Sequence, residues 1–456
     1  MKPKQSLEWI KQFELNCNNL NYKVGGIDCW PIARNTLLSI VLPKSRQGGQ
    51  PKYSIASKQI IYFVRAVRDL FSFKKADIFV LTDTKFSENI SGSIYLKDSH
   101  VIREEAKNNS ETSTIALQNL FIGDNVVGRE CCRSVFAIIL ISAVLAKLSF
   151  IVKFIPLLSG YVERLCGELS DAPMLSDSSI SYEKLKSQIY TNILFCIVAS
   201  RLFSYVLKRV RPKRAYVVCY YSVLGMSLCA ACRRMEIPIT DIQHGVAGGS
   251  MRAYSGWMNV PRDGYTTLPD RFLCWTVYDA RAIREWAQHT VRHEAVAVGS
   301  LWRNYAIEKF LLREVEDQWA DFFLKINDYE KKILITMQSS ELAPLFVDVV
   351  KRSKPSYCFL IRMHPGFLLK KDQNYTDLTR SYPNVFFEQV SQIPIQVLMR
   401  HIDLHMTEWS GAVIDAYFEN VRSIVISEVS LDYFEELIAQ GKVIYAHTLK
   451  SILRNM

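Results

Sequence analysis

Short apolar runs alternate with helical patterns along the second half of this 456-residue chain, and this rhythm constrains the fold most strongly. Residues 215–220 (AYVVCY) and 238–242 (PITDI) have the character of buried strands, and residues 225–235 between them predict a helix. A strand, a helix and a strand within about 30 residues form a βαβ unit, whose strands lie parallel in one sheet. The chain is therefore predicted to be α/β, with its ligands at the carboxyl ends of the strands.

The same alternation returns after residue 330 and predicts a second α/β sheet. Its strands are expected at residues 332–336, 357–362, 385–387, 404–407 and 423–427. A single hydrophobic core rarely grows beyond about 250–300 residues, so two domains suit the length of the chain. We place the linker near residues 299–303, which gives an N-terminal domain of residues 1–300 and a C-terminal domain of residues 301–456.

The first 200 residues give weaker signals. Residues 77–83 form an apolar run bounded by charge, which predicts a buried strand. From there to about residue 130 the chain is rich in Ser, Asn and Glu, and we interpret it as surface loops and an edge of the first domain. Two long helical patterns follow, at about 133–155 and 182–210, and we expect them to form a helical insertion in the N-terminal domain.

Charge and cysteine content limit the class of partner and the compartment. The chain has 56 Lys and Arg against 45 Asp and Glu, a net charge of +11 that favours phosphorylated ligands, nucleic acid or an anionic membrane. The basic residues are scattered rather than interleaved with an RNA-binding aromatic signature, so we expect no nucleic-acid partner. Eleven cysteines, with Cys131 and Cys132 adjacent, suit a reducing cytosol better than a disulfide framework.

The most apolar segment of the chain bears on membrane association. Residues 134–146 form the longest uncharged apolar run, which is shorter than the roughly 18 residues that a membrane-spanning helix needs. The segment could lie in a membrane interface, with Lys147 and Lys153 reaching lipid phosphates, or it could be a buried core helix. The N-terminus has no apolar core of the kind that a secretory signal needs, so we expect the protein to stay where it is made.

The densest polar signal is the sequence DIQHGVAGG at residues 241–249, directly after a predicted strand. Such a strand end presents the His244 imidazole at the carboxyl edge of the sheet, where it could act as a general base or donate a hydrogen bond to a ligand. The flanking glycines, including Gly245, allow a ligand to approach the backbone closely. Asp241, Gln243 and Tyr254 accompany it. The alternative is a turn histidine that is hydrogen-bonded to backbone.

Two further signals follow predicted strands of the second sheet. In IRMHPG, residues 361–366, Pro365 ends the strand, so Arg362 and His364 could converge on one anion such as a diphosphate, although ordinary turns also contain such residues. In MTEWSGAVID, residues 406–415, a strand gives way to a helix whose first N–H groups favour phosphate. The hydroxyl-rich turn at residues 336–340 lies on the same edge.

The second of these motifs could also be no more than a helix cap. Its candidate residues are Thr407, Ser410 and Gly411, and those of the turn at 336–340 are Gln338 and Ser339.

Other patterns do not reach the level of a site. Three pairs have a spacing that metal ligands also show. We interpret Cys229 with Cys232 as core packing and His289 with His293 as part of a solvated helix face. We interpret His401 with His405 as a structural pair. The sequence contains no Walker A loop, no G-x-G-x-x-G and no G-x-S-x-G, which disfavours P-loop ATPases, ordinary dinucleotide oxidoreductases and α/β-hydrolases.

Together, Asp241-x-Gln-His-Gly245, Arg362-x-His-Pro365 and Thr407-x-x-Ser-Gly411 resemble the motifs of bacterial surface-polysaccharide glycosyltransferases of the GT-B kind. In these enzymes two Rossmann-like domains face one another across a cleft. The His-Pro pair is similar to the pair with which capsule Kdo transferases, bacterial sialyltransferases and teichoic-acid glycerophosphotransferases hold the donor phosphate. The resemblance spans roughly residues 211–426. The Glu-x7-Glu pattern of many retaining GT-B enzymes is absent, which leaves the stereochemical outcome open.

The resemblance also implies roles for individual residues. His244 or Asp241 would remove the proton from the attacking hydroxyl, with the acceptor held beside Gln243, Gly245 and Tyr254. The donor would be bound by Arg362, His364, Pro365, Thr407, Ser410, Gly411, Gln338 and Ser339. No metal and no cofactor would be needed, because cationic side chains and a helix dipole offset the charge on the departing nucleotide.

The resulting hypothesis is a glycosyltransferase that moves a sugar from a CMP- or UDP-linked donor to a growing capsule or O-antigen glycan. It would work in the cytoplasm, at the anionic surface of the inner membrane. The alternatives are a polyol-phosphate transferase of the teichoic-acid type, a non-hydrolysing UDP-sugar 2-epimerase, and a non-catalytic assembly protein.

Overall fold

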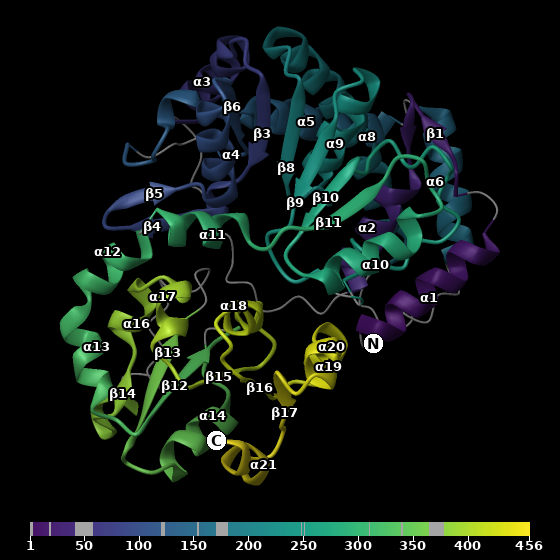
Figure 1. Cartoon of the computed structure of the whole chain (residues 1–456). Helices are drawn as coiled ribbons and strands as arrows, with labels where there is room; N and C mark the ends of the chain where they lie inside the picture. The colour runs from purple at the N-terminus through teal and green to yellow at the C-terminus, as the bar shows by residue number, and fades with distance from the viewer. Residues whose placement is uncertain are drawn as a thin grey trace.

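Two parallel sheets, each covered by helices, form two Rossmann-like domains that face one another in the computed structural model (Figure 1). This is the GT-B architecture, so the predicted fold class is confirmed. The structure describes residues 3–17, 20–41, 58–119, 124–152, 155–169, 181–247, 249, 251–309, 311–338, 341–363 and 378–456.

The N-terminal domain is built on a seven-stranded parallel sheet in the order β11-β10-β9-β8-β3-β6-β7. Its strands are β3 (Ile78–Thr82), β6 (Ser113–Leu117), β7 (Cys132–Ser134), β8 (Arg214–Val218), β9 (Ile239–Ile242), β10 (Arg271–Cys274) and β11 (Glu294–Ala297). The strand order reverses between β3 and β8, and in open α/β sheets such a reversal marks the place where ligands bind.

The C-terminal domain repeats the plan with a six-stranded parallel sheet in the order β14-β13-β12-β15-β16-β17. Its strands are β12 (Lys331–Thr336), β13 (Tyr357–Arg362), β14 (Val385–Phe386), β15 (Leu404–Thr407), β16 (Ser423–Val425) and β17 (Val443–Tyr445). The reversal lies between β12 and β15. The strands that the sequence predicts in this half agree with the observed ones to within two residues.

Helices cover both faces of the N-terminal sheet. They are α1 (Pro3–Asn16), α2 (Trp30–Val41), α3 (Lys58–Ser72), α4 (Lys97–Asn108), α5 (Phe136–Val152), α6 (Pro156–Leu169), α8 (Tyr182–Val210), α9 (Val223–Arg234) and α10 (Val277–Ala287). On one face, Leu70 of α3, Ile138 of α5 and Phe203 of α8 share a buried cluster with Phe79 of β3. On the other face, α4 packs its Ile102 into a separate cluster.

The interpretation of residues 83–130 as surface loops is wrong. This segment contains the hairpin of β4 (Glu88–Ile90) and β5 (Ser93–Tyr95), helix α4 and the inner strand β6. The polar residues belong to the hairpin and to α4, where Asp98, Ser99 and Arg103 are buried, and Ile115 and Leu117 of β6 are buried as well. A second small hairpin is formed by β1 (Lys23–Val24) and β2 (Ile27–Asp28).

The remaining helices connect the domains and cover the C-terminal sheet. They are α11 (Leu301–Glu308), α12 (Leu311–Gln318), α13 (Ala320–Asn327), α14 (Pro344–Arg352), α16 (Glu388–Gln392), α17 (Ile395–Arg400), α18 (Ala412–Phe418), α19 (Val429–Tyr433), α20 (Glu435–Ala439) and α21 (Leu449–Asn455). None of the described helices is long and apolar enough to cross a membrane.

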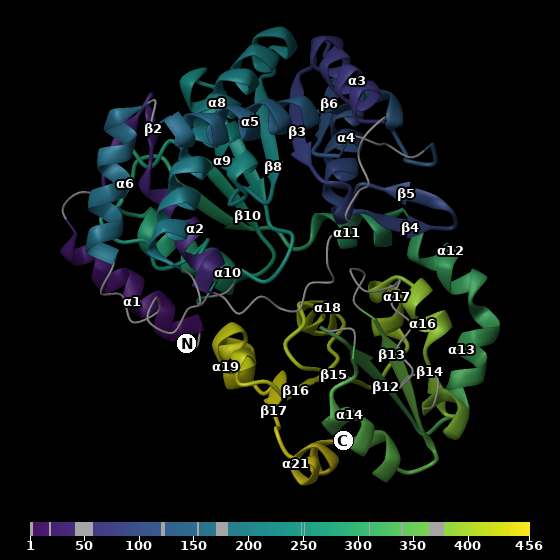
Figure 2. The same cartoon turned by 180° about the vertical axis from the view of Figure 1, so that it is seen from behind.

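Contacts at two places away from the sheets tie the domains together. The backbone N–H of Trp302, at the start of α11, donates to the Asp98 carboxylate at 3.1 Å, which fixes the connecting helix against the N-terminal domain. At the other side, α1 reaches back to the C-terminal domain, where the Lys4 backbone N–H donates to Asp432 at 2.8 Å. Figure 2 shows α1 beside α19.

Candidate active site

A cleft of about 1650 Å³ lies between the two domains, and both contribute to its walls. Part of its lining comes from segments that directly follow the carboxyl ends of strands. In the N-terminal domain these are residues 85–89 after β3, Tyr221 after β8 and residues 244–246 after β9. In the C-terminal domain they are residues 337–338 after β12 and residues 409–411 after β15. The points at which the two sheets reverse their strand order therefore share one cleft.

His244 lines this cleft, as the sequence predicts for the end of its strand. Its Nε2 lies 3.1 Å from the hydroxyl of Tyr221, and its ring packs against Phe86 with the ring centroids 4.6 Å apart. Burial, with smaller contributions from the positive charges of Lys85 and Lys97, lowers the pKa of His244 to about 3. The imidazole is therefore neutral at pH 7.

The second ring nitrogen of His244, Nδ1, is buried and has no hydrogen-bond partner within the described part of the chain. In the tautomer that donates from Nε2 to Tyr221, Nδ1 keeps a free lone pair. Such a nitrogen can accept a hydrogen bond from a hydroxyl group.

Asp241, Gln243 and Tyr254 lie beneath the cleft rather than in it. The Asp241 carboxylate is buried and accepts hydrogen bonds from the backbone N–H of Tyr220 at 3.0 Å and from the hydroxyl of Tyr254 at 2.9 Å. Gln243 is buried as well; its amide donates to the Gly245 carbonyl at 2.7 Å and accepts from the Trp275 backbone N–H at 2.7 Å. These polar groups satisfy backbone at the strand ends, so they shape the loop that presents His244 and Gly245.

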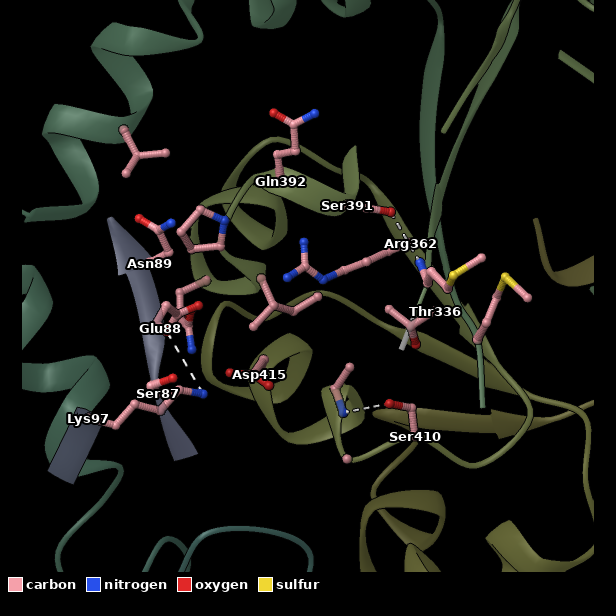
Figure 3. Close-up of a pocket in the computed structure, with 18 of the residues that line it drawn as sticks. Ser87, Glu88, Asn89, Lys97, Thr336, Arg362, Ser391, Gln392, Ser410 and Asp415 are labelled. Atoms are coloured by element: carbon pink, nitrogen blue, oxygen red, sulfur yellow. Dashed lines mark hydrogen bonds and ion pairs between the residues drawn. The ribbon is translucent and has the colours of Figure 1, made fainter. Parts of the chain in front are cut away.

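Arg362 projects into the cleft from the end of β13 (Figure 3). Its Nη1 donates to the backbone carbonyls of Val390, at 2.8 Å, and Ile393, which fixes the guanidinium. Burial lowers the pKa of Arg362, and the negative charges of Glu88 and Asp415 act in the opposite direction. An arginine remains protonated in proteins, so a fixed cation faces the cleft.

The three residues predicted around the start of α18 divide into two groups. Ser410 and Gly411 line the cleft, and the Ser410 hydroxyl accepts from the Ala412 backbone N–H at 3.2 Å. Thr407 is fully buried, and its hydroxyl donates to the Thr336 carbonyl at 2.7 Å, so it joins β15 to β12 instead. A side chain at Gly411 would lie 3.6 Å from Val246 of the other domain, which places this turn where the domains approach closely.

The remaining predicted donor residues are Gln338, Ser339, His364 and Pro365. Gln338 lines the cleft after β12. Ser339, His364 and Pro365 lie outside the described residues.

Sequence reasoning missed the hairpin β4–β5 and its surroundings. Glu88 lines the cleft, where its carboxylate accepts from the indole N–H of Trp302 at 2.7 Å and lies 3.9 Å from the Lys97 ammonium. Across the cleft, burial raises the pKa of Asp415 to about 6. Figure 3 shows Glu88, Asp415 and Arg362 around the same space. The signal that could have found the hairpin is its position after β3, a central strand at the reversal point.

Among the described residues, the charges that line the cleft balance. This part of the lining contains four basic and four acidic side chains: Lys85, Lys97, Lys325 and Arg362, and Glu88, Asp98, Glu388 and Asp415.

The discounted metal pairs are structural. Among the described residues no group of three or more His, Cys, Asp and Glu side chains could hold a metal ion. Cys229 and Cys232 are buried in α9, as predicted, and His405 bridges the Thr336 and Ser423 hydroxyls at 2.8 and 2.9 Å. His293, predicted on a solvated helix face, is instead buried beyond the end of α10, where Nδ1 contacts the Pro269 carbonyl at 2.7 Å.

Several solved structures are similar to this chain at low sequence identity. No family model and no curated protein matches the sequence. The UDP-GlcNAc 2-epimerase of Neisseria meningitidis, solved with UDP-GlcNAc, is 14% identical with a TM-score of 0.45, and the match covers 83% of this chain and 90% of that chain. The UDP-GlcNAc 2-epimerase of Methanocaldococcus jannaschii, in complex with UDP-GlcNAc and UDP, gives 10% identity, a TM-score of 0.48 and coverages of 83% and 91%.

A transferase is also among the similar structures. The wall teichoic acid polymerase TagF gives 12% identity, a TM-score of 0.38 and coverages of 84% and 82%. At these identities the likeness concerns the fold alone.

Proposed function

We propose that this protein is a glycosyltransferase that moves a sugar from a nucleotide-activated donor to a hydroxyl of a growing capsule or O-antigen glycan. The observation that carries the proposal is the free Nδ1 of a neutral His244 in the wall of a cleft whose other wall holds Arg362. One group can take a proton from an acceptor, and the other can stabilise the negative charge of a departing nucleotide.

The size of the cleft supports two substrates rather than one. Sites for a single small ligand typically have volumes of about 300–1,000 Å³. The cleft between the domains measures about 1650 Å³, which leaves space for an acceptor beside a nucleotide sugar. An epimerase acts on one nucleotide sugar and needs no acceptor space. This difference favours transfer over the epimerase alternative.

In the proposed reaction the acceptor hydroxyl oxygen attacks the anomeric carbon of the donor sugar. The new carbon–oxygen bond forms as the bond from that carbon to the nucleotide phosphate breaks. The proton of the hydroxyl passes to Nδ1 of His244, and the electron pair leaves with the phosphate oxygen. Arg362 faces the phosphate, together with the Ser410 hydroxyl, the backbone at Gly411 and the Gln338 amide. His364, Pro365 and Ser339 remain candidates on the donor side.

The proposed place of work is the cytoplasmic surface of the inner membrane, where a lipid-linked glycan would be the acceptor. A polyol-phosphate transferase of the teichoic-acid type would use the same phosphate-binding wall, with a CDP-linked polyol as donor. It remains the second candidate because the cleft offers a fixed cation for either donor.

A donor screen followed by a turnover assay tests the proposal. Thermal shift with CMP-sugars, UDP-sugars and CDP-polyols identifies the donor, and acceptor-dependent release of the free nucleotide then measures transfer. We expect a shift with one class of nucleotide sugar and release only when a glycan acceptor is present. Conversion of a UDP-sugar to its 2-epimer without acceptor, or a shift with CDP-polyols alone, would replace this proposal by the corresponding alternative. The absence of any shift would favour an assembly protein.

A further inference from the structure

Exposed apolar side chains gather on the outer surface of α3, α5 and α8. Seven of the fourteen exposed large hydrophobic side chains among the described residues lie on these helices: Val64, Phe71, Val144, Leu145, Leu148, Tyr182 and Tyr205. Phe71 exposes 56% and Leu148 exposes 55% of its surface. Single exposed apolar residues are common on soluble proteins, but a group of this kind usually marks an interaction site. We call this group, with the basic residues around it, the α3–α5–α8 surface.

The three helices pack side by side, since α5 contacts both α3 and α8. Each of them buries side chains in the large hydrophobic cluster of the N-terminal domain. The rings of Phe71 and Tyr205 are in contact, with centroids 6.0 Å apart, and the Arg209 guanidinium donates to the Phe71 carbonyl at 2.9 Å. In Figures 1 and 2 these helices lie at the end of the N-terminal domain away from the C-terminal domain.

The charge of this surface is mostly positive. The exposed basic residues on and beside these stretches of helix are Arg68, Lys74, Lys75, Lys147, Arg201, Lys208, Arg209 and Arg211. Residues 58–75, 136–152 and 201–211 contain a single acidic residue, Asp69. The described lining of the cleft, by contrast, has equal numbers of acidic and basic side chains. Basic side chains therefore lie beside this group of exposed apolar side chains.

We propose that the α3–α5–α8 surface docks the protein on an anionic lipid bilayer. Phe71, Leu148 and Tyr205 would enter the boundary between headgroups and acyl chains, while the lysine and arginine heads reach the lipid phosphates. A second copy of this chain fits less well, because a two-fold contact would bring like charges together. The proposal goes beyond the proposed function, because it concerns a face of the N-terminal domain that lies apart from the cleft.

Vesicle flotation of the full chain tests the docking surface. Wild type is expected to float with vesicles of phosphatidylcholine and phosphatidylglycerol, and to float poorly with phosphatidylcholine alone. Each basic residue near an anionic surface contributes about five-fold to binding, so R68Q/K147Q/K208Q is expected to weaken binding by about 100-fold. The apolar variant F71S/L148S/Y205S is expected to weaken it by about ten-fold or more.

Matched controls carry the same changes elsewhere. K351Q/K450Q/R454Q removes three exposed cations from the C-terminal domain, and V291S/L324S removes two exposed apolar side chains. Both controls are expected to float like wild type. The proposal is overturned if wild type does not float, if the controls lose binding as the surface variants do, or if the surface variants change the oligomeric state in solution instead of vesicle binding.

The same preparations separate this proposal from the proposed function. A nucleotide thermal shift measured on each variant reports the cleft, which lies in a different part of the molecule. Vesicle binding without any nucleotide response would overturn the glycosyltransferase and leave the docking surface standing. A nucleotide response without vesicle binding would overturn the docking surface and leave the proposed glycosyltransferase function standing.

Discussion

The turn after β9 and the hairpin β4–β5 both contribute to the N-terminal wall of the cleft, but by different means. In the turn, Asp241 and Gln243 are buried and hold backbone, and the residues that line the cleft are His244 and Gly245. In the hairpin, Glu88 both lines the cleft and accepts a hydrogen bond from Trp302. Most polar residues of the turn after β9 thus hold the backbone in place, whereas the hairpin β4–β5 contributes a charged side chain to the cleft.

The physical reason lies in the ends of parallel strands. Beyond the end of a strand, backbone N–H and C=O groups no longer have hydrogen-bond partners in the neighbouring strand. When these groups are buried, side chains must form hydrogen bonds with them. Asp241 and Gln243 meet this need, so a dense polar motif at a strand end contains supporting residues as well as functional ones. A hairpin that projects from the sheet has its own ladder, which leaves its side chains free to face a ligand.

Replacement of His244 by alanine is expected to have the largest effect on turnover. General base catalysis typically contributes about 10²- to 10⁴-fold, so kcat should fall by that factor while donor affinity changes little. Acceptor-dependent nucleotide release measures kcat, and calorimetry measures donor affinity. The matched control is His289→Ala, because His289 is exposed and does not line the cleft. A His244→Ala enzyme with normal turnover would remove the base from the proposed mechanism.

Asp241→Asn should change the pH dependence of stability rather than the chemistry. Burial raises the pKa of Asp241 from 3.8 to about 7. A raised carboxyl pKa means that the folded state holds its proton longer than the unfolded state, so wild type loses stability as pH rises from about 4 to about 7, by about 4 kcal/mol. The asparagine keeps an acceptor for the Tyr220 N–H and has no proton to lose.

Thermal unfolding of wild type and Asp241→Asn across this pH range gives the comparison. The wild-type midpoint should fall relative to that of the variant as pH rises, and the folded variant should retain far more turnover than His244→Ala. Equal pH profiles would show that Asp241 is not held protonated. A loss of turnover as large as that of His244→Ala would indicate that the Asp241 carboxyl takes part in the reaction.

Arg362→Ala is expected to weaken donor binding by about 10- to 100-fold, because hydrogen bonds to charged groups contribute about 1.5–3 kcal/mol. Arg362→Lys should recover little, since one ammonium cannot hold two backbone carbonyls and also face the phosphate. Calorimetry with the donor nucleotide measures the change. Arg352→Ala, an exposed arginine at the end of α14, serves as the control. If the Arg362→Ala variant keeps its donor affinity, the donor phosphate does not bind at the end of β13.

Glu88 offers a test of the hairpin. Glu88→Ala leaves the Trp302 indole N–H without its acceptor, which should cost about 1–3 kcal/mol of unfolding free energy. Glu88→Gln keeps an acceptor oxygen and should cost less. Urea unfolding of the two variants and wild type gives the measurement. If alanine and glutamine destabilise the protein equally, the charge of Glu88 matters for stability and the hydrogen bond does not.

The sequence predicted five of the six strands of the C-terminal sheet because their signal is local, whereas β6, β7, β10 and β17 were missed. Runs such as residues 332–336 and 357–362 are short, apolar and bounded by charge, and the structure places strands there. Strand β10 was missed because RFLC is short and begins with an exposed arginine. The reversal of strand order, which positions the site, depends on the pairing of β3 with β8 across more than 100 residues, and no local pattern reports it.

The site was predicted only in part for a related reason. A motif shows which residues gather at a strand end, but burial decides which of them face the cleft. His244, Gly245, Arg362, Ser410, Gly411 and Gln338 reach the cleft, whereas Asp241, Gln243, Tyr254 and Thr407 do not. Glu88 and Asp415 come from opposite domains, and their approach follows from the way the domains face one another, which composition does not encode.

The smallest expected effect concerns Tyr221, which supports His244 from below. Tyr221→Phe removes the 3.1 Å contact with Nε2 but keeps the ring stacked on the imidazole. A neutral hydrogen bond contributes about 0.5–1.5 kcal/mol, so kcat should fall by about 2- to 10-fold. Tyr254→Phe, which removes a hydroxyl bonded to Asp241 beneath the cleft, is the matched control and should leave kcat closer to wild type. A Tyr221→Phe enzyme as slow as His244→Ala would mean that the hydroxyl, and not Nδ1, receives the acceptor's proton.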